Sequence, residues 1–491
     1  MKRSTRRIVF RLVAVAIGLM PFVLLELGLR LAGVAADPVN PAQSQPLSAI
    51  DHDPLVDLHS LRPLFVRSED GSMMNIGEER MNYFCPASFS IAKPSNTIRI
   101  FALGGSTTQG QPYLPETAFP KWLELRLQAA LPERKIEVIN AGGISYASYR
   151  VAAILDEVLR YSPDLVVLYT GHNEFLEART YARQRSIPRW MAGPLAMVSR
   201  LRVARVAGRM FADEQVASGS KTALPGEVDT MLDHADGMDA YQRDEDWTEG
   251  VHRHFETTLA RMIDRCQDES VPMVLCVPAG DIVNTPPFKS VPAEGLTASQ
   301  NDSLTAWAKT IQSDAEFDLR MKAAEDILKL DPQNALANYA LGRWKYEAAE
   351  DDPADAIKYL TMSRDHDVCS LRATTRIENE VRSYRDAENV YLVDTPRLLD
   401  RRDATLAAKP DGIADPSWFV DHVHPSIEGH QVIAEGIFDR LLDRGWIEPK
   451  TKSDASYAVA VENHLKTLGE AYFGRAKQRL EGVNRWSRRN Q

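Results

Sequence analysis

A serine that directly follows two glycines is the first residue in this chain that could do chemistry. Ser106 comes after Gly104 and Gly105, at the end of an apolar run over residues 98–103. Such a run is typical of a buried strand, and glycines let the backbone turn sharply and let a second molecule approach closely. The sequence therefore predicts a serine hydroxyl presented at a tight strand-to-helix turn.

Asp421 and His424 could activate that serine. A serine hydroxyl is a weak nucleophile until a base takes its proton, and the base works better when a third group orients it. Asp421 and His424 lie three residues apart, just before Pro425 and a helical pattern over residues 425–441. A turn with this spacing can place a carboxylate beside an imidazole. His422 is the alternative base, but the Asp-x-x-His spacing and the following proline favour His424.

Two further residues could stabilise a negative charge on an oxygen. Gly142 follows an apolar run over residues 135–140, and Asn173 follows another over residues 165–169. The tetrahedral intermediate of acyl transfer needs hydrogen-bond donors aimed at its oxyanion. We expect three donors here: the backbone N–H groups of Ser106 and Gly142, and the side-chain amide of Asn173.

Apolar runs alternate with helical patterns along most of the chain. The predicted strands span residues 98–103, 135–140, 165–169, 271–277 and 390–393. This alternation predicts an α/β fold with a parallel sheet that helices cover on both faces. Ligands of such sheets bind beyond the carboxyl ends of the strands. Because Ser106, Gly142 and Asn173 each follow such an end, we expect them to meet at one edge of the sheet.

Four sequence blocks, in this order, resemble those of the SGNH (GDSL-type) hydrolase superfamily. The blocks are LGGSTT around Ser106, NAG ending at Gly142, GHNE around Asn173 and DxxHP from Asp421. The resemblance covers roughly residues 96–300 and 366–445. It implies a three-layer α/β/α fold, similar to flavodoxin, with a five-stranded parallel sheet. It also implies ester hydrolysis by Ser106, His424 and Asp421 without a metal or a cofactor.

Composition excludes several other classes of protein. The chain has 491 residues and a net charge of -10, with 44% hydrophobic and 26% charged residues, which is typical of globular proteins. The negative charge and the lack of a basic groove motif argue against a nucleic-acid partner. The four cysteines are far apart and form no C-x-x-C pair, which excludes a disulfide scaffold and a zinc ribbon. One or two disulfides remain compatible with this spacing.

The N-terminus combines positive charge with a hydrophobic run. An apolar stretch spans residues 12–25 and resumes over residues 27–36. Basic residues before such a stretch favour a cytoplasmic N-terminus and export of the remainder. We expect residues 1–36 to be a single-pass signal anchor, and a signal peptide cleaved near residues 34–36 is the alternative. The basic residues are Lys2, Arg3, Arg6, Arg7 and Arg11.

The rest of the chain divides into a hydrolase domain and its additions. The expected segments are a linker and lead-in over 37–95, the hydrolase domain over 96–297 and 371–445, a helical insertion over 298–370, and a helical extension over 446–491. The insertion resembles a tetratricopeptide repeat through Leu341-Gly342 and Ala356, and a generic helical hairpin is the alternative. Residues 175–245 are expected to form an active-site flap or a surface loop.

These observations predict a membrane-anchored serine esterase. Its expected substrates are small acyl esters, such as acetyl esters, of envelope carbohydrate or lipid, cleaved through an acyl-serine intermediate. An O-acyltransferase would use the same Ser106, His424 and Asp421 with an acceptor hydroxyl in place of water. A non-catalytic envelope protein that docks a protein partner through the helical insertion is a third interpretation.

Overall fold

The computed structural model describes most of the chain beyond its N-terminal segment. The described residues are Met20, 63–177, 228–349, 353–400, 413–448 and 453–489. Apart from Met20, the predicted anchor lies outside them, as do residues 37–62 of the linker and lead-in and residues 178–227 of the predicted flap. No helix within these ranges is long and apolar enough to cross a bilayer.

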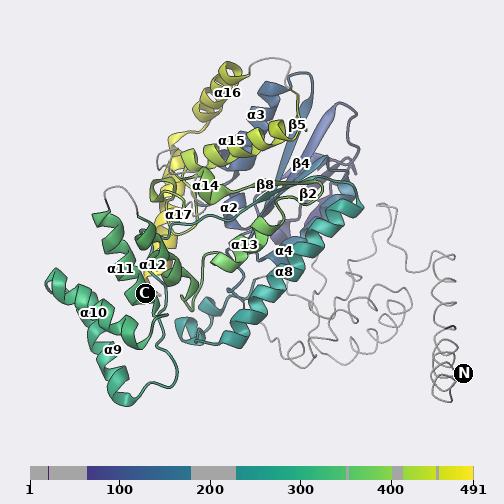
Figure 1. The fold of residues 1–491 in the computed structure, drawn as a ribbon. Coiled ribbons are helices and arrows are strands. Elements are labelled where there is room, and N and C mark those ends of the chain that lie inside the picture. Colours follow the sequence, from purple (N-terminus) through teal and green to yellow (C-terminus); the bar gives the residue numbers. More distant parts are fainter. Residues whose placement is uncertain are drawn as a thin grey trace, which may run out of the picture. The chain divides into compact units, whose positions relative to one another are not determined.

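A five-stranded parallel sheet forms the centre of the domain (Figure 1). Its strands lie in the order β5-β4-β6-β7-β8, so β4, the first strand of this sheet along the chain, lies between the second and the third, β5 and β6. This reversal of strand order marks the place where ligands bind in such sheets. The predicted parallel sheet is confirmed, with β7 shorter than the run from which it was predicted. The bounds are β4 Thr97–Gly104, β5 Lys135–Gly142, β6 Leu165–Tyr169, β7 Met273–Cys276 and β8 Val390–Val393.

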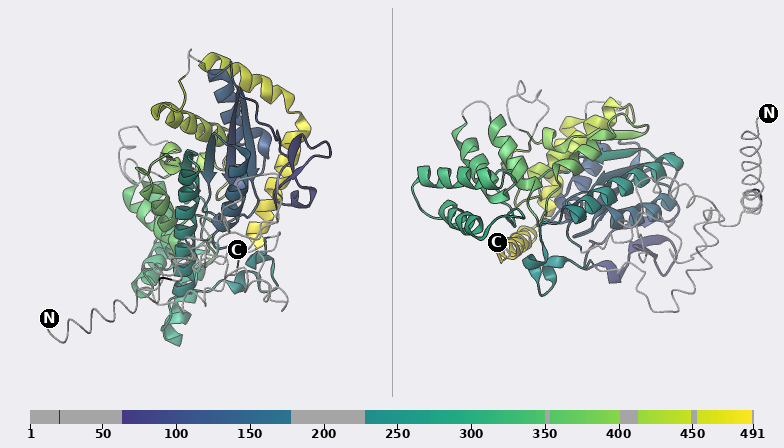
Figure 2. Two further views of the ribbon diagram at one scale, coloured as in Figure 1. Left: turned by 90° about the vertical axis from the view of Figure 1, so that its right-hand side faces the viewer. Right: turned by 60° about the horizontal axis from the view of Figure 1, so that its bottom comes forward.

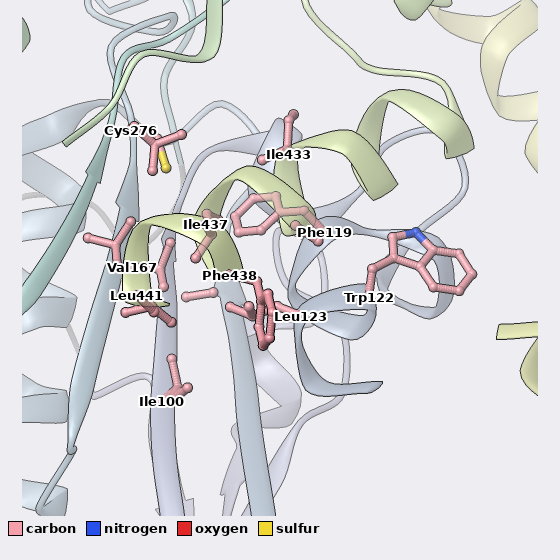
Figure 3. Close-up of a cluster of buried hydrophobic side chains, with 14 of the residues drawn as sticks. Ile100, Phe119, Trp122, Leu123, Val167, Cys276, Ile433, Ile437, Phe438 and Leu441 are labelled. Carbon is pink, nitrogen blue, oxygen red and sulfur yellow. The ribbon is translucent and has the colours of Figure 1, made fainter. Parts of the chain in front are cut away.

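One face of the sheet is covered by helices α3 (Phe119–Ala130) and α15 (Ile427–Asp443). Side chains of a strand alternate between its two faces, and Ile100 and Ala102 of β4 point into this side of the core. Figure 3 shows Phe438 and Leu441 of α15 packed near Leu123 of α3 and Ile100 of the sheet. Burial of this apolar surface holds α3 and α15 together, although the two helices lie about 300 residues apart in the sequence.

The opposite face carries helices α4 (Ser148–Val158) and α8 (Glu245–Asp268), which pack against each other (Figure 2). The sheet therefore lies between two helical layers, which confirms the α/β/α arrangement. Phe101 of β4 points to this side and meets Phe89 with ring centroids 5.3 Å apart. Phe89 belongs to a small antiparallel sheet in the lead-in, formed by β1 (Phe65–Arg67), β2 (Met73–Ile76) and β3 (Ser88–Ser90).

The insertion consists of four helices in the described residues. They are α9 (Ala298–Ile311), α10 (Phe317–Leu330), α11 (Ala335–Ala348) and α12 (Ala354–Asp365). A Cβ on Gly342 of α11 would lie 2.8 Å from Leu360 Cγ of α12, so the glycine permits the close packing of this helix pair. Tyr339 of α11 donates to the Val283 carbonyl at 3.1 Å and ties the insertion to the hydrolase domain. Its relation to tetratricopeptide repeats stays a prediction.

The predicted helical extension at the C-terminus forms two helices. Helix α16 spans Asp454–Thr467 and helix α17 spans Glu470–Arg489. Arg126 of α3 donates to Ser453 Oγ at 2.6 Å and to Asp454 Oδ1 at 2.8 Å, which holds the start of α16 against the domain. The Tyr472 hydroxyl of α17 lies 2.8 Å from Thr117 Oγ1.

None of the four cysteines forms a disulfide. Cys266, Cys276 and Cys369 are buried, and desolvation raises the pKa of the Cys266 thiol to about 12. These side chains pack as small apolar groups, since a thiol with a raised pKa is a poor nucleophile.

Leu441→Ala is expected to destabilise the domain by about 2–5 kcal/mol, because Leu441 is fully buried between α15 and the sheet and truncation leaves a cavity. Chemical unfolding followed by circular dichroism measures this change. Leu319→Ala is the matched control, since Leu319 also lies in a helix but is 55% exposed. Equal effects of the two substitutions would contradict the assignment of this core.

Candidate active site

Ser106 is the first residue of the short helix α2 (Ser106–Gln109), directly after β4. A Cβ on Gly104 would lie 2.1 Å from the Tyr169 carbonyl oxygen, so only glycine fits between the two strand ends. Within residues 101–110, Ser106 alone is not fully buried. The turn therefore presents one hydroxyl at the surface of an otherwise buried segment.

His424 links Ser106 to Asp421. His424 Nε2 lies 2.7 Å from Ser106 Oγ, and His424 Nδ1 lies 2.6 Å from Asp421 Oδ2. The second carboxylate oxygen, Oδ1, accepts the backbone N–H groups of Val423 and His424, both at 2.9 Å. The Asp-x-x-His spacing thus forms a turn in which the carboxylate binds both the backbone and the side chain of the histidine.

Asp421 is held in its ionised form. Burial alone would raise its pKa, but the neighbouring His424 and His422 and the hydrogen bonds to the carboxylate hold the pKa of Asp421 well below its usual range. An ionised carboxylate accepts a hydrogen bond from His424 Nδ1–H, which leaves Nε2 as the acceptor for the Ser106 hydroxyl.

His422 occupies a different position from His424. Its Nδ1 is 3.7 Å from Asp421 Oδ1, and its ring meets the Phe288 ring edge-on with centroids 5.1 Å apart. Burial lowers the pKa of His422 to about 4, so the ring is neutral near pH 7. The structure therefore places His424, rather than His422, against the Ser106 hydroxyl.

Asn173 lies beside the Ser106 turn, as expected from its place after β6. Its side-chain Nδ2 donates to the Tyr146 carbonyl at 3.1 Å, and a Cβ on Gly105 would lie only 2.7 Å from the same nitrogen. Asn173 is the one residue of 170–177 that is not fully buried. Its amide group is therefore available at the same surface as Ser106.

Gly142 does not present its N–H in the way the sequence suggested. This N–H donates to Asn140 Oδ1 at 2.9 Å, and Gly142 is buried. A Cβ there would lie 2.3 Å from the Gln109 nitrogen. A glycine is needed at this position because β5 packs tightly against α2. A glycine at a strand end is therefore found both where the backbone packs closely and where an N–H faces a ligand, and the sequence does not distinguish the two.

Ser145 is a residue that the sequence analysis missed. It lies in the loop after β5, is partly exposed, and has a positive φ of 60°. Among the described residues its N–H has no hydrogen-bond acceptor, whereas the N–H of Ile144 donates to the Tyr83 carbonyl at 2.9 Å. No sequence signal pointed to it, since a left-handed serine cannot be recognised from residue type.

Two other histidines near the site are buried and neutral. His172 Nδ1 accepts the Ala373 N–H at 3.2 Å, and His430 Nδ1 accepts the Phe119 N–H at 3.3 Å. Each backbone donor places the ring proton on Nε2. Burial lowers the pKa of both groups to about 3. The geometry therefore leaves His424 as the histidine that can exchange a proton with Ser106.

This arrangement can perform nucleophilic catalysis with an activated serine. In such a reaction Ser106 can act as the nucleophile, His424 can accept its proton, and Asp421 can stabilise the imidazolium that results. Within the described ranges, no group of three His, Cys, Asp or Glu side chains could hold a metal ion.

Residues 102–333 match the model of the GDSL-like lipase/acylhydrolase family. This match supports the resemblance of the chain to SGNH (GDSL-type) hydrolases and supports an ester-hydrolysing serine hydrolase. The matched segment contains Ser106 and Asn173 and ends before Asp421 and His424. Comparison with curated proteins gives no match.

Several solved hydrolases align with the chain at low similarity. An acetylxylan esterase from Geobacillus stearothermophilus is 13% identical with a TM-score of 0.30, covering 70% of this chain and 94% of its own. A GDSL-like lipase from Bacteroides thetaiotaomicron is 11% identical with a TM-score of 0.28, and the alignment covers 70% of this chain and 88% of the lipase. An alpha/beta hydrolase from the metagenome of Lake Arreo is 14% identical with a TM-score of 0.28, and the alignment covers 71% of this chain and 96% of that hydrolase. Likeness at this level carries no inference about substrate.

The stability of the protein is expected to fall on acidification, and His430 is expected to contribute. Its pKa is about 3 in the folded chain, against ~6.5 when unfolded. Below pH 6.5 the unfolded chain therefore binds a proton that the folded chain does not, and the free energy of unfolding decreases. His430→Asn keeps an acceptor for the Phe119 N–H and removes the titration.

Urea unfolding at pH 7 and pH 5 measures this contribution. The loss of stability between the two pH values should be smaller in the His430→Asn variant by about 2 kcal/mol, the value for 1.5 pH units. An identical loss in both proteins would show that the ring is not held neutral.

Proposed function

We propose that this esterase uses Ser106 as nucleophile, His424 as general base and acid, and Asp421 as the group that orients His424. One observation carries the proposal: the continuous chain of hydrogen bonds from Asp421 to His424 at 2.6 Å and from His424 to Ser106 at 2.7 Å. The bond between His424 and Ser106 joins residues that lie 318 positions apart in the sequence.

The geometry supports a two-step reaction. Ser106 Oγ attacks the ester carbonyl carbon while His424 Nε2 takes the hydroxyl proton. Collapse of the tetrahedral intermediate breaks the ester C–O bond, and His424 returns the proton to the departing alcohol. Water then attacks the carbonyl carbon of the acyl-serine while His424 takes one of its protons. The bond between the acyl carbon and Ser106 Oγ breaks, His424 returns the proton to Ser106 Oγ, and the carboxylic acid is released. Asp421 stays ionised throughout.

The oxyanion of each intermediate needs donors, and we assign three. The N–H of Ser106 begins helix α2, the side-chain amide of Asn173 lies beside Gly105, and the N–H of Ser145 replaces that of Gly142. Ser145 is partly exposed, and its N–H has no acceptor among the described residues, whereas Gly142 is buried and its N–H donates to Asn140 Oδ1. Each donor of this kind contributes roughly 10²–10³-fold to kcat in serine hydrolases.

The substrates proposed are small acyl esters, such as acetyl esters, on envelope carbohydrate or lipid. The support is the N-terminal sequence, in which basic residues precede an apolar run over residues 12–25, as in exported and anchored proteins. A hydrolase tethered there would meet envelope polymers and lipids first.

Ser106→Ala is expected to lower the hydrolysis of 4-nitrophenyl acetate by at least about 10³-fold, because the nucleophile is lost while the fold is retained. A series of 4-nitrophenyl esters of increasing chain length should show preference for the shortest acyl groups. Circular dichroism of the variant controls for folding. Turnover retained in the variant would contradict the assignment, and acyl transfer only in the presence of an acceptor would identify a transferase.

The location is tested on intact cells that produce the full chain. The protein should sediment with membranes. External protease should digest the catalytic domain once the outer layers of the envelope are made permeable, while the cytoplasmic membrane is still intact. Protection of the domain until lysis would contradict export. Release into the soluble exported fraction, with residues before about 36 removed, would indicate a cleaved signal peptide.

A further inference from the structure

We propose that Glu174 is a positioning residue, whose carboxylate holds Asn173 at the place where the oxyanion forms. The inference rests on the proposed esterase reaction and extends it to a residue outside the hydrogen-bonded Asp421–His424–Ser106 chain. Glu174 directly follows Asn173 but is only 6% exposed, so it acts beneath the surface on which Asn173 lies.

Both carboxylate oxygens of Glu174 bind the start of helix α4. Oε1 accepts the backbone N–H of Ser148 at 2.8 Å, and Oε2 accepts the Ser148 hydroxyl at 2.8 Å. The N-cap residue of this helix is Ala147, which has no side chain able to cap it. A carboxylate from another segment therefore takes that role, at the helix end where negative charge is favoured.

Asn173 binds the other end of the same short segment. Its amide donates to the Tyr146 carbonyl at 3.1 Å, two residues before Ser148. Consecutive residues, Asn173 and Glu174, thus hold a stretch of three residues at both ends. Ser145 directly precedes that stretch, so this pair of contacts also sets the distance between the Asn173 amide and the Ser145 N–H.

The Gly105 turn shows why small displacements matter here. The Asn173 amide nitrogen lies so close to Gly105 that a Cβ there would be 2.7 Å away. An oxyanion donor is effective only when it points at the developing charge, and a displacement of about 1 Å can cost 10²-fold in rate. Loss of the Glu174 contacts would let the Asn173 side chain shift without changing any group that touches the substrate.

A second anchor keeps the segment folded when Glu174 is changed. Glu177, three residues later, binds Arg150 of α4 through its Oε1 at 2.6 Å and accepts the Asp229 N–H at 3.1 Å. Glu177 is 7% exposed and Arg150 is fully buried. Substitution of Glu174 should therefore loosen the position of Asn173 rather than release the whole segment.

The chain offers a matched control for the alternative, in which Glu174 only caps a helix. Glu157 lies on the same helix α4, is 4% exposed, and accepts the N–H groups of Leu64 and Phe65 at 2.7 and 2.8 Å. These contacts bind the lead-in rather than the site. Glu157 also accepts the Tyr161 hydroxyl at 3.2 Å. Loss of either carboxylate leaves at least two donors without this acceptor, so both substitutions should reduce stability.

The experiment compares Glu174→Ala, Glu174→Gln and Glu157→Ala in the full chain, with 4-nitrophenyl acetate as substrate. We expect Glu174→Ala to lower kcat by about 10- to 100-fold with KM changed less than about twofold, the pattern of a contact that acts in the transition state. Glu157→Ala should leave kcat within about twofold of wild type. Glu174→Gln should recover most of kcat, because its amide oxygen accepts the Ser148 N–H and its amide N–H can donate to the Ser148 hydroxyl.

A double-substitution cycle with Asn173→Ala separates positioning from a general loss of stability. If Glu174 acts through Asn173, Glu174→Ala should reduce kcat little further in the Asn173→Ala background. Additive losses, or equal kcat for Glu174→Ala and Glu157→Ala, would overturn the inference and leave Glu174 as a helix cap. Wild-type protein without turnover, or Ser106→Ala with normal turnover, would instead refute the proposed function, and the inference would fall with it.

Discussion

The hydrogen bond between His424 Nε2 and Ser106 Oγ joins two residues 318 positions apart. The rest of the fold is organised so that this contact can form. Ser106 is held by the turn after β4, and His424 by a turn just before helix α15. Both elements are brought together because α15 and the strands bury their apolar side chains in one core, shown in Figure 3.

Around that contact, the protein keeps one histidine available and three others neutral. His172 and His430 are buried with backbone N–H donors on Nδ1, and His422 packs edge-on against Phe288. Burial disfavours their charged forms. The buried, ionised Asp421 carboxylate therefore interacts mainly with His424, which donates a hydrogen bond to it from Nδ1 at 2.6 Å.

The glycines of this site have different purposes that residue type alone does not reveal. Gly104 and Gly105 allow the Ser106 turn to lie against the ends of β6 and the Asn173 side chain, whereas Gly142 allows β5 to pack on α2. All three stand at strand ends, so all three resemble residues that approach a ligand. Only the tertiary structure distinguishes a glycine beside Ser106 from one that packs against the neighbouring backbone.

Much of this protein could be predicted from its sequence because local signals were strong. Apolar runs bounded by glycine and proline identified the five parallel strands, and the blocks around Ser106, Asn173 and Asp421 indicated an acyl-serine hydrolase. Three features could not be predicted: the left-handed backbone of Ser145, the buried N–H of Gly142, and the hydrogen bonds from Ser148 to the Glu174 carboxylate. Those features depend on which segments meet across the sheet, and hydrogen-bond partners distant in the chain leave no local pattern. The sequence by itself determined the fold class and the chemical groups, whereas tertiary packing decided which N–H groups stay free and which histidine can take the proton.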